Sequence, residues 1–133
     1  MGPVRAVWAV DNRTALIRAI PAGINTHVEN RLGSADANPY LLAAVNVAAG
    51  LDGLAKQLDP GVPGEGNMFE DKRFAYLSTT LIEGVEAYAD DRVLVDARGT
   101  DFSRIYTGVL RNDWKRFIEH VTDWEIREYR EIL

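Results

Sequence analysis

Five polar residues near the start of the chain have side chains suited to binding charged ligands. His27, Glu29 and Arg31 occupy alternate positions, so a strand here would present all three on one face. Two further arginines, Arg13 and Arg18, precede them. A guanidinium group suits bidentate binding of a carboxylate or phosphate, and a glutamate carboxylate is a hard oxygen ligand that suits Mg²⁺. The same residues could instead form a ladder of ion pairs across neighbouring strands, with His27 as a surface residue.

Three predicted strands have to position these side chains. Residues 5–10, 15–20 and 26–32 contain β-branched or alternating side chains, and turn-forming residues separate them. Short links between consecutive strands are typical of antiparallel pairing. The pattern therefore predicts a short antiparallel sheet of three strands within residues 1–34. The edges of this sheet would be unpaired, so we expect them to associate with another chain.

A very apolar helix is predicted next, over residues 38–58. Asn38 is a good N-cap, and Pro39 fits the first helical position because its missing N–H costs nothing there. The segment has too few polar residues for a surface helix, so we expect it to be buried. A loop rich in Pro and Gly, residues 59–78, follows it.

The last part of the chain, residues 79–133, is predicted to be helical. Capping boxes, in which Thr is followed three residues later by Glu, begin at Thr80 and Thr122. Apolar residues recur at helical spacing over residues 101–121. The order of elements predicts an α+β fold, with three strands followed by four or five helices, in a single domain of residues 1–133.

Composition narrows the classes of function. The 133 residues carry 15 basic and 20 acidic side chains, a net charge of −5, and 47% of them are apolar. An acidic chain without a Lys/Arg block is a poor candidate for binding nucleic acid or anionic membranes. No apolar stretch reaches the roughly 18 residues that a membrane span needs. The absence of cysteine excludes disulfides and thiolate chemistry, and it fits a cytoplasmic protein.

Several motifs, in a fixed order, resemble those of glutamine synthetases. Residues 10–18 are similar to the family's Asn-Arg-Ser/Thr stretch that ends in Ile-Arg, and residues 28–31 resemble its Glu-x-Arg strand. Residues 35–41 and 48–53 are similar to its Ala-Asn-Pro-Tyr helix and the Ala-Gly-Leu-Asp-Gly end of that helix. Residues 121–125 resemble the C-terminal tail of one branch of the family, which includes γ-glutamyl-polyamine and γ-glutamyl-amide ligases. The resemblance covers nearly all of this chain, but a third or less of a family protein.

The resemblance implies a role for each of four residues. The family uses ATP to phosphorylate the γ-carboxylate of glutamate, and ammonia or an amine then displaces the phosphate; the reaction needs Mg²⁺ or Mn²⁺. Glu29 matches a metal-binding carboxylate, and Arg31 matches the arginine that holds the glutamate substrate. Arg13 matches a catalytic arginine near the transferred phosphate and the glutamate, and Arg18 matches an arginine that contacts ATP.

Two positions depart from the family pattern. His27 stands where the family often has an arginine, so a permanent cation is replaced by a group that is neutral above about pH 6.5. Residues 67–70 resemble the loop whose tyrosine is adenylylated in some bacterial enzymes. Phe69 has no hydroxyl group, so that control is not expected to operate here.

One glutamate cannot build a magnesium site by itself, because such a site usually has one or two carboxylates together with phosphates and waters. We therefore expect a chain that is inactive alone and contributes Arg13, Arg18, Glu29 and Arg31 to a split ligase. Its partner would carry the rest of a glutamine-synthetase-like enzyme in a hetero-oligomer. The alternatives are a non-catalytic regulatory subunit that binds a full-length relative, or a truncated relic. The residues do not identify the amine acceptor.

Overall fold

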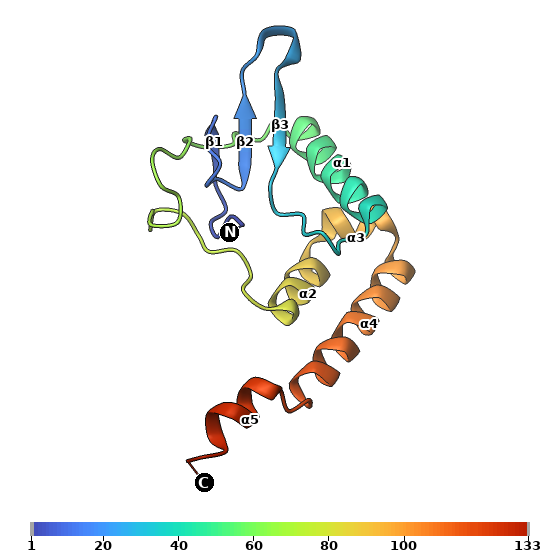
Figure 1. The fold of residues 1–133 in the computed structure, drawn as a ribbon. Helices are drawn as coiled ribbons and strands as arrows, with labels where there is room; N and C mark the ends of the chain where they lie inside the picture. The colour runs from blue at the N-terminus through green and yellow to red at the C-terminus, as the bar shows by residue number, and fades with distance from the viewer. Residues whose placement is uncertain (1, 133) are drawn as a thin grey trace. The chain divides into compact units, whose positions relative to one another are not determined.

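The computed structural model describes residues 2–132, with strands first and helices after them (Figure 1). This order confirms the predicted α+β fold class. The sequence predicted one domain, whereas the structure divides into two compact units, Met1–Thr79 and Thr80–Leu133. Among the described residues, no helix has the length and apolar character needed to cross a membrane.

The first unit contains a sheet in which the strands follow the order of the sequence. β1 (Trp8–Val10), β2 (Ile17–Ile20) and β3 (His27–Asn30) lie side by side, with a 3-10 turn, Gly23–Asn25, between the last two. β2 and β3 pair antiparallel, as predicted, in a register that places Arg18 opposite Glu29. Because alternate residues share a face, this register fixes which side chains can meet.

The pairing of β1 with β2 is parallel, so the prediction of a fully antiparallel sheet was wrong. A parallel connection usually needs a dozen or more residues, but β1 is only three residues long and residues 11–16 suffice to return the chain to its start. Asp11 begins the return with a φ of 46°. The side-chain oxygen of Asn12 then accepts hydrogen bonds from the Thr14 amide, at 2.9 Å, and from the Thr14 hydroxyl, at 2.7 Å.

A small core holds β1 against the loop that was predicted at residues 59–78. Met68 is fully buried with Val7, Ala9 and Ala15. The amide of Met68 also donates to the Thr14 hydroxyl, with an N···O distance of 3.0 Å. The loop therefore fixes the link between β1 and β2, which carries Arg13.

α1 (Pro39–Ala55) begins as predicted. The Asn38 side chain accepts hydrogen bonds from the amides of Tyr40 and Leu41, at 3.0 and 3.2 Å. The expected burial is not found within this chain, where no residue of α1 is buried. A side-chain hydrogen bond between Asn30 and Asn46, with an N···O distance of 2.8 Å, joins α1 to β3. Large apolar side chains from Tyr40 to Leu58 are 60–84% exposed: Tyr40, Val47, Leu51, Leu54 and Leu58.

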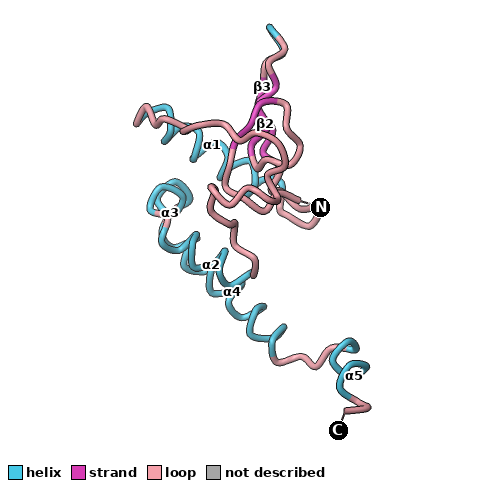
Figure 2. The backbone as a smooth tube through the Cα atoms, turned by 90° about the vertical axis from the view of Figure 1, so that its left-hand side faces the viewer, coloured by secondary structure: helices cyan, strands magenta, loops and turns pink. Residues whose placement is uncertain are grey.

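The second unit is helical, as predicted (Figure 2). It consists of α2 (Leu81–Asp90), α3 (Arg92–Arg98), α4 (Thr100–Ile118) and α5 (Asp123–Tyr129). Both capping boxes are formed, at Thr80 before α2 and at Thr122 before α5. Between α3 and α4, Gly99 adopts a φ of 87°, a conformation that favours glycine.

Helices of the second unit are joined by polar and aromatic contacts. The Tyr88 and Ser103 hydroxyls are 2.7 Å apart, and the Arg111 guanidinium is 2.7 Å from the Glu86 carboxylate. The hydrogen bonds from Arg111 lower the pKa of Glu86 below its ordinary value. These contacts connect α2 to α4.

Candidate functional site

An ion-paired cluster forms where the register places Arg18 opposite Glu29. Arg18 Nη1 lies 3.2 Å from Glu29 Oε2, and Arg18 Nε donates to Asp11 Oδ1 at 3.1 Å. Arg18 Nη2 also forms an ion pair with Asp11. The Arg18 side chain is only 15% exposed. The hydrogen bond to Asp11, and then that to Glu29, raises the pKa of Arg18.

Asp11 is part of this cluster although the sequence pattern indicated only a turn residue there. It reaches Arg18 because β1 and β2 run parallel: the Asp11 amide donates to the Ala19 carbonyl, with an N···O distance of 2.8 Å. An antiparallel pairing would have separated the two residues. In the sequence, Asp11 is visible only as an acidic residue before Asn12 and Arg13. Its contact with Arg18 could not be predicted from this, because the contact depends on the direction in which β1 pairs with β2.

Arg31 follows β3 and shares a face with Glu29. Its amide donates to the Leu16 carbonyl, with an N···O distance of 2.9 Å, which continues the β2–β3 register by one more pair. Its Nη1 is buried and has no hydrogen-bond partner among the described residues. A buried donor without a partner is costly, so this nitrogen is suited to meet an oxygen from outside the chain.

Arg13 is exposed on the link between β1 and β2. Within residues 2–132, its guanidinium takes part in no hydrogen bond or ion pair. The structure therefore joins Arg18 to Glu29, leaves Arg31 on the same face, and keeps Arg13 separate from them. The functional roles assigned to these four residues remain predictions.

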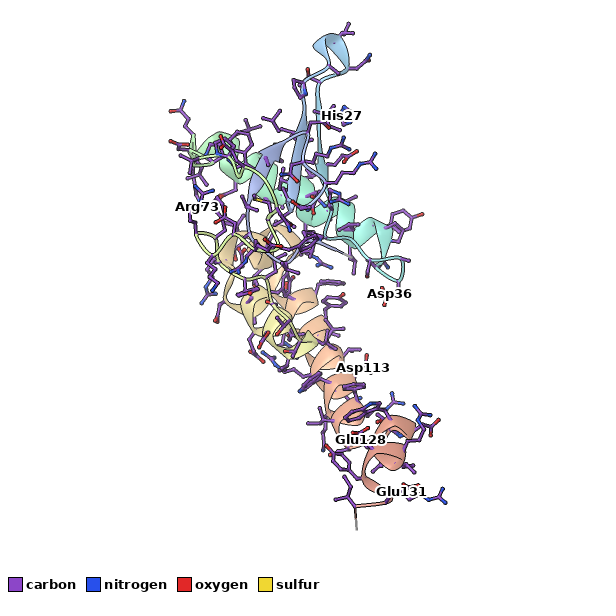
Figure 3. All side chains as sticks on the ribbon, turned by 60° about the vertical axis from the view of Figure 1, so that its left-hand side comes forward. His27, Asp36, Arg73, Asp113, Glu128 and Glu131 are labelled. Atoms are coloured by element: carbon purple, nitrogen blue, oxygen red, sulfur yellow. The ribbon has the colours of Figure 1, made fainter. Side chains whose placement is uncertain are left out.

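His27 is exposed at the start of β3 and is labelled in Figure 3. Its Nδ1 lies 2.7 Å from the Asn25 carbonyl oxygen, so the turn before β3 fixes the ring. Alternation along β3 places His27 on the same face as Glu29. This arrangement agrees with the interpretation of His27 as a surface residue of the strand.

The described residues do not by themselves form a divalent-cation site. They contain no cluster of three or more His, Cys, Asp or Glu side chains that could hold a metal ion. Glu29 is 40% exposed at its side chain, and Arg18 engages one of its oxygens. A magnesium site usually combines one or two carboxylates with phosphates and waters, so Glu29 can supply at most one ligand here. The β2–β3 face offers the guanidinium groups of Arg18 and Arg31 for anions and the carboxylate of Glu29, and Arg13 lies apart from them on the link between β1 and β2.

Comparison with known proteins identifies the family. The family described as "Glutamine synthetase, catalytic domain" matches residues 1–129. This chain belongs to the glutamine synthetase family, as its motifs predicted. It is 36% identical to a glutamine synthetase of Thermotoga maritima, over 96% of this chain and 31% of that protein. It is 37% identical to a γ-glutamylethanolamide synthetase of Streptomyces coelicolor, over 94% of this chain and 27% of that protein.

Solved structures give the same result. The structure described as the GmaS/ADP complex superposes with a TM-score of 0.85 at 30% identity, over 98% of this chain and 30% of that one. The structure described as apo GmaS without ligand gives a TM-score of 0.81 at 33% identity, over 95% of this chain and 30% of that one. The chain thus spans about a third or less of the relatives that it matches.

Proposed function

We propose that this chain is one part of a glutamine-synthetase-like, ATP-dependent ligase that joins glutamate to ammonia or an amine. The observation that carries the proposal is the shared face of β2 and β3, on which Arg18, Glu29 and Arg31 gather in a chain of this family. The similar proteins include glutamine synthetases and γ-glutamyl-amide synthetases, which are ligases of this kind.

Each arginine has donors to offer in this role. Arg18 uses Nε, Nη1 and Nη2 for Asp11 and Glu29, and two of the five N–H groups of a guanidinium remain for nucleotide phosphates. Arg31 has a buried Nη1 without a partner in the described chain, which suits the carboxylate of the glutamate substrate. Arg13, exposed and without a partner in residues 2–132, would reach the transferred phosphoryl group and stabilise its developing charge.

Glu29 would contribute one oxygen to a site for Mg²⁺ or Mn²⁺. Such an ion, when bound with ATP, neutralises phosphate charge during transfer. Arg18 would act as a positioning residue for this carboxylate, since it holds Oε2 at 3.2 Å and is itself fixed by Asp11. This chain supplies too few ligands for the site, so the remaining ones would come from a partner chain in a hetero-oligomer.

The proposal is tested by purifying the tagged full chain from its native host with any bound protein, and by measuring ATP-dependent amide formation from glutamate with ammonia and a panel of amines. Glu29→Ala and Arg31→Ala should each lower the rate at least about 100-fold, as expected when a group that stabilises the transition state is removed. Glu128→Ala and Arg127→Ala on α5 are matched controls and should leave the rate unchanged. Full activity of an assembled Glu29→Ala complex would refute the catalytic role.

A second candidate is a non-catalytic regulatory subunit. Two observations favour it. The carboxylates of Asp11 and Glu29 already neutralise the charge of Arg18, and the described residues contain no cluster of side chains that could hold a metal ion. This candidate would be supported if a full-length synthetase were recovered with this chain and if binding of this chain changed the activity of that synthetase. The change should be the same with Glu29→Ala and Arg31→Ala as with the wild type. Recovery of a chain that has only the remaining part of the enzyme would support the split ligase.

A further inference from the structure

The hydrogen bond at the start of β3 assigns the tautomer of His27. Nδ1 lies 2.7 Å from the Asn25 carbonyl oxygen, and a carbonyl can only accept, so Nδ1 carries the proton of the neutral ring. The other ring nitrogen, Nε2, then has a free lone pair. The imidazole is exposed, and within residues 2–132 Nε2 has no hydrogen-bond partner. Histidines that bind metal ions usually donate their second N–H to a carbonyl or carboxylate in this way.

The turn before β3 holds in place the carbonyl that fixes this ring. The Thr26 hydroxyl donates to the Gly23 carbonyl at 2.8 Å and accepts from the Ala22 amide at 3.1 Å. The Thr26 amide donates to the same Gly23 carbonyl at 3.1 Å. These bonds close the turn on itself, so the Asn25 carbonyl has a defined position. The lone pair of His27 is therefore carried by a ring that is already oriented.

Glu29 presents a second possible ligand on the same face. Alternate residues of a strand lie about 6.5 Å apart, so two side chains at such positions can converge on one ion. Arg18 engages Oε2 of Glu29, whereas Oε1 has no hydrogen-bond partner among the described residues. An imidazole nitrogen and a carboxylate oxygen that both lie about 2.0–2.2 Å from one ion would form a two-residue chelate.

The charges along this row favour a cation at its His27 end. Arg18 lies opposite Glu29, but its charge is already shared by the carboxylates of Asp11 and Glu29. Arg31 follows Glu29 in the chain and thus lies on the side away from His27. A dication between His27 and Glu29 therefore meets less positive charge than one placed between Glu29 and Arg31.

We propose that His27 and Glu29 bind a divalent transition-metal ion such as Zn²⁺, with Nε2 and Oε1 as ligands and water at the other positions. Imidazole suits such ions, whereas Mg²⁺ takes oxygen ligands. Two ligands make a weak site, in keeping with the absence of a larger cluster among the described residues. The inference rests on the proposed function only through Glu29, whose carboxylate would hold an ion there. His27 would then favour a transition-metal ion over Mg²⁺ at that carboxylate.

NMR spectroscopy of the full ¹⁵N-labelled chain tests this pair, with Zn²⁺ as the probe at about pH 7.5, where an ordinary imidazole is mostly neutral. The chain has two histidines, and His120, which follows α4, is the internal control. Zn²⁺ should shift the Nε2 signal of His27 to saturation, with at least about tenfold higher affinity than at His120. Mg²⁺ should leave the His27 signals unchanged.

Three variants distinguish a chelate from a single histidine. Glu29→Gln removes the charged oxygen at nearly constant size and should weaken Zn²⁺ binding at His27 at least about tenfold. His27→Gln should abolish it. The double variant His27→Val with Val28→His moves the imidazole to the opposite face of β3 at unchanged composition, and should bind no better than His120. Backbone amide spectra check that each variant is folded, and if the double variant is not, Glu29→Gln decides.

The outcomes separate this inference from the proposed function. Equal affinity at the two histidines, or unchanged binding in Glu29→Gln, would mean an adventitious ion only and would overturn the metal pair. Selective binding by a chain whose native complex forms no amide would support the metal pair and count against the ligase. An active complex built from a chain without selective binding would overturn the metal pair and leave the ligase intact.

Discussion

The contact between Gly64 and Met68 predicts a measurable coupling in the core of the first unit. A Cβ on Gly64 would lie 2.2 Å from Met68 Sδ and 2.9 Å from Val7 Cγ2, and both side chains are buried. Gly64→Ala should therefore cost about 1–3 kcal/mol through overpacking. Met68→Ala removes a fully buried side chain and should cost about 2–5 kcal/mol.

The double variant decides whether this reasoning is right. With Met68 shortened, the new methyl group of Gly64→Ala would occupy part of the cavity. The loss in the double variant should then be smaller than the sum of the single losses by about 1 kcal/mol or more, a typical coupling for residues in contact. Strict additivity, or a Gly64→Ala variant within about 0.5 kcal/mol of wild type, would refute it.

Urea unfolding provides the assay. Trp8 donates to the carbonyls of Pro60 and Gly61, at 3.1 and 3.0 Å, so its fluorescence reports on the loop that carries Gly64. Trp114 and Trp124 lie in the second unit and would be replaced by Phe in every variant, so that the signal comes from the first unit alone. An unchanged dependence on urea concentration would show that the variants change stability and not the extent of unfolding.

Three other predictions test the local structure. Thr80→Ala removes the N-cap of α2 and should cost about 1 kcal/mol, seen as faster amide exchange in that helix, while Thr80→Ser should match the wild type; equal exchange in Thr80→Ala would contradict the cap. Arg73 lowers the pKa of Asp71 to about 2. Because about 3.9 is usual for an unfolded chain, this carboxylate stabilises the fold above about pH 4, and its contribution disappears as pH falls toward 2. The urea midpoint should thus fall more steeply between pH 5 and 2 in the wild type than in Asp71→Asn, and identical slopes would exclude the effect. Arg98 lies 4.6 Å from the centroid of the Phe102 ring, and its Nη2 is buried without a partner in the described chain. Arg98→Met should stay within about 1.5 kcal/mol of wild type in thermal unfolding, and Arg98→Ala should lose more because it leaves a cavity; an equally large loss in both variants would mean that the charge itself is required.

Local signals in the sequence predicted the elements that depend on nearby residues. The N-caps at Asn38, Thr80 and Thr122 are formed because each cap involves residues two or three positions away. The antiparallel pairing of β2 with β3 also followed from local pattern, as did the placement of His27 and Glu29 on one face of β3. The family was evident from motifs spread along the chain.

Long-range contacts decided what the sequence could not predict. The parallel pairing of β1 depends on the return of residues 11–16, which Met68 fixes from a distance of more than fifty residues. That pairing alone brings Asp11 to Arg18. The burial expected for α1 followed from its composition, but composition does not specify which chain supplies the covering surface.

We propose above all that the face of β2 and β3 that carries Arg18, Glu29 and Arg31 acts in an ATP-dependent ligase. A partner chain would supply the rest of its active site. The most direct test titrates the purified partner with this chain and follows amide formation. We predict no activity from either chain alone, activity that rises to saturation at equal amounts, and its loss with Glu29→Ala although the complex still assembles. Activity of the partner alone that is unaffected by this chain, or full activity with Glu29→Ala, would contradict the account.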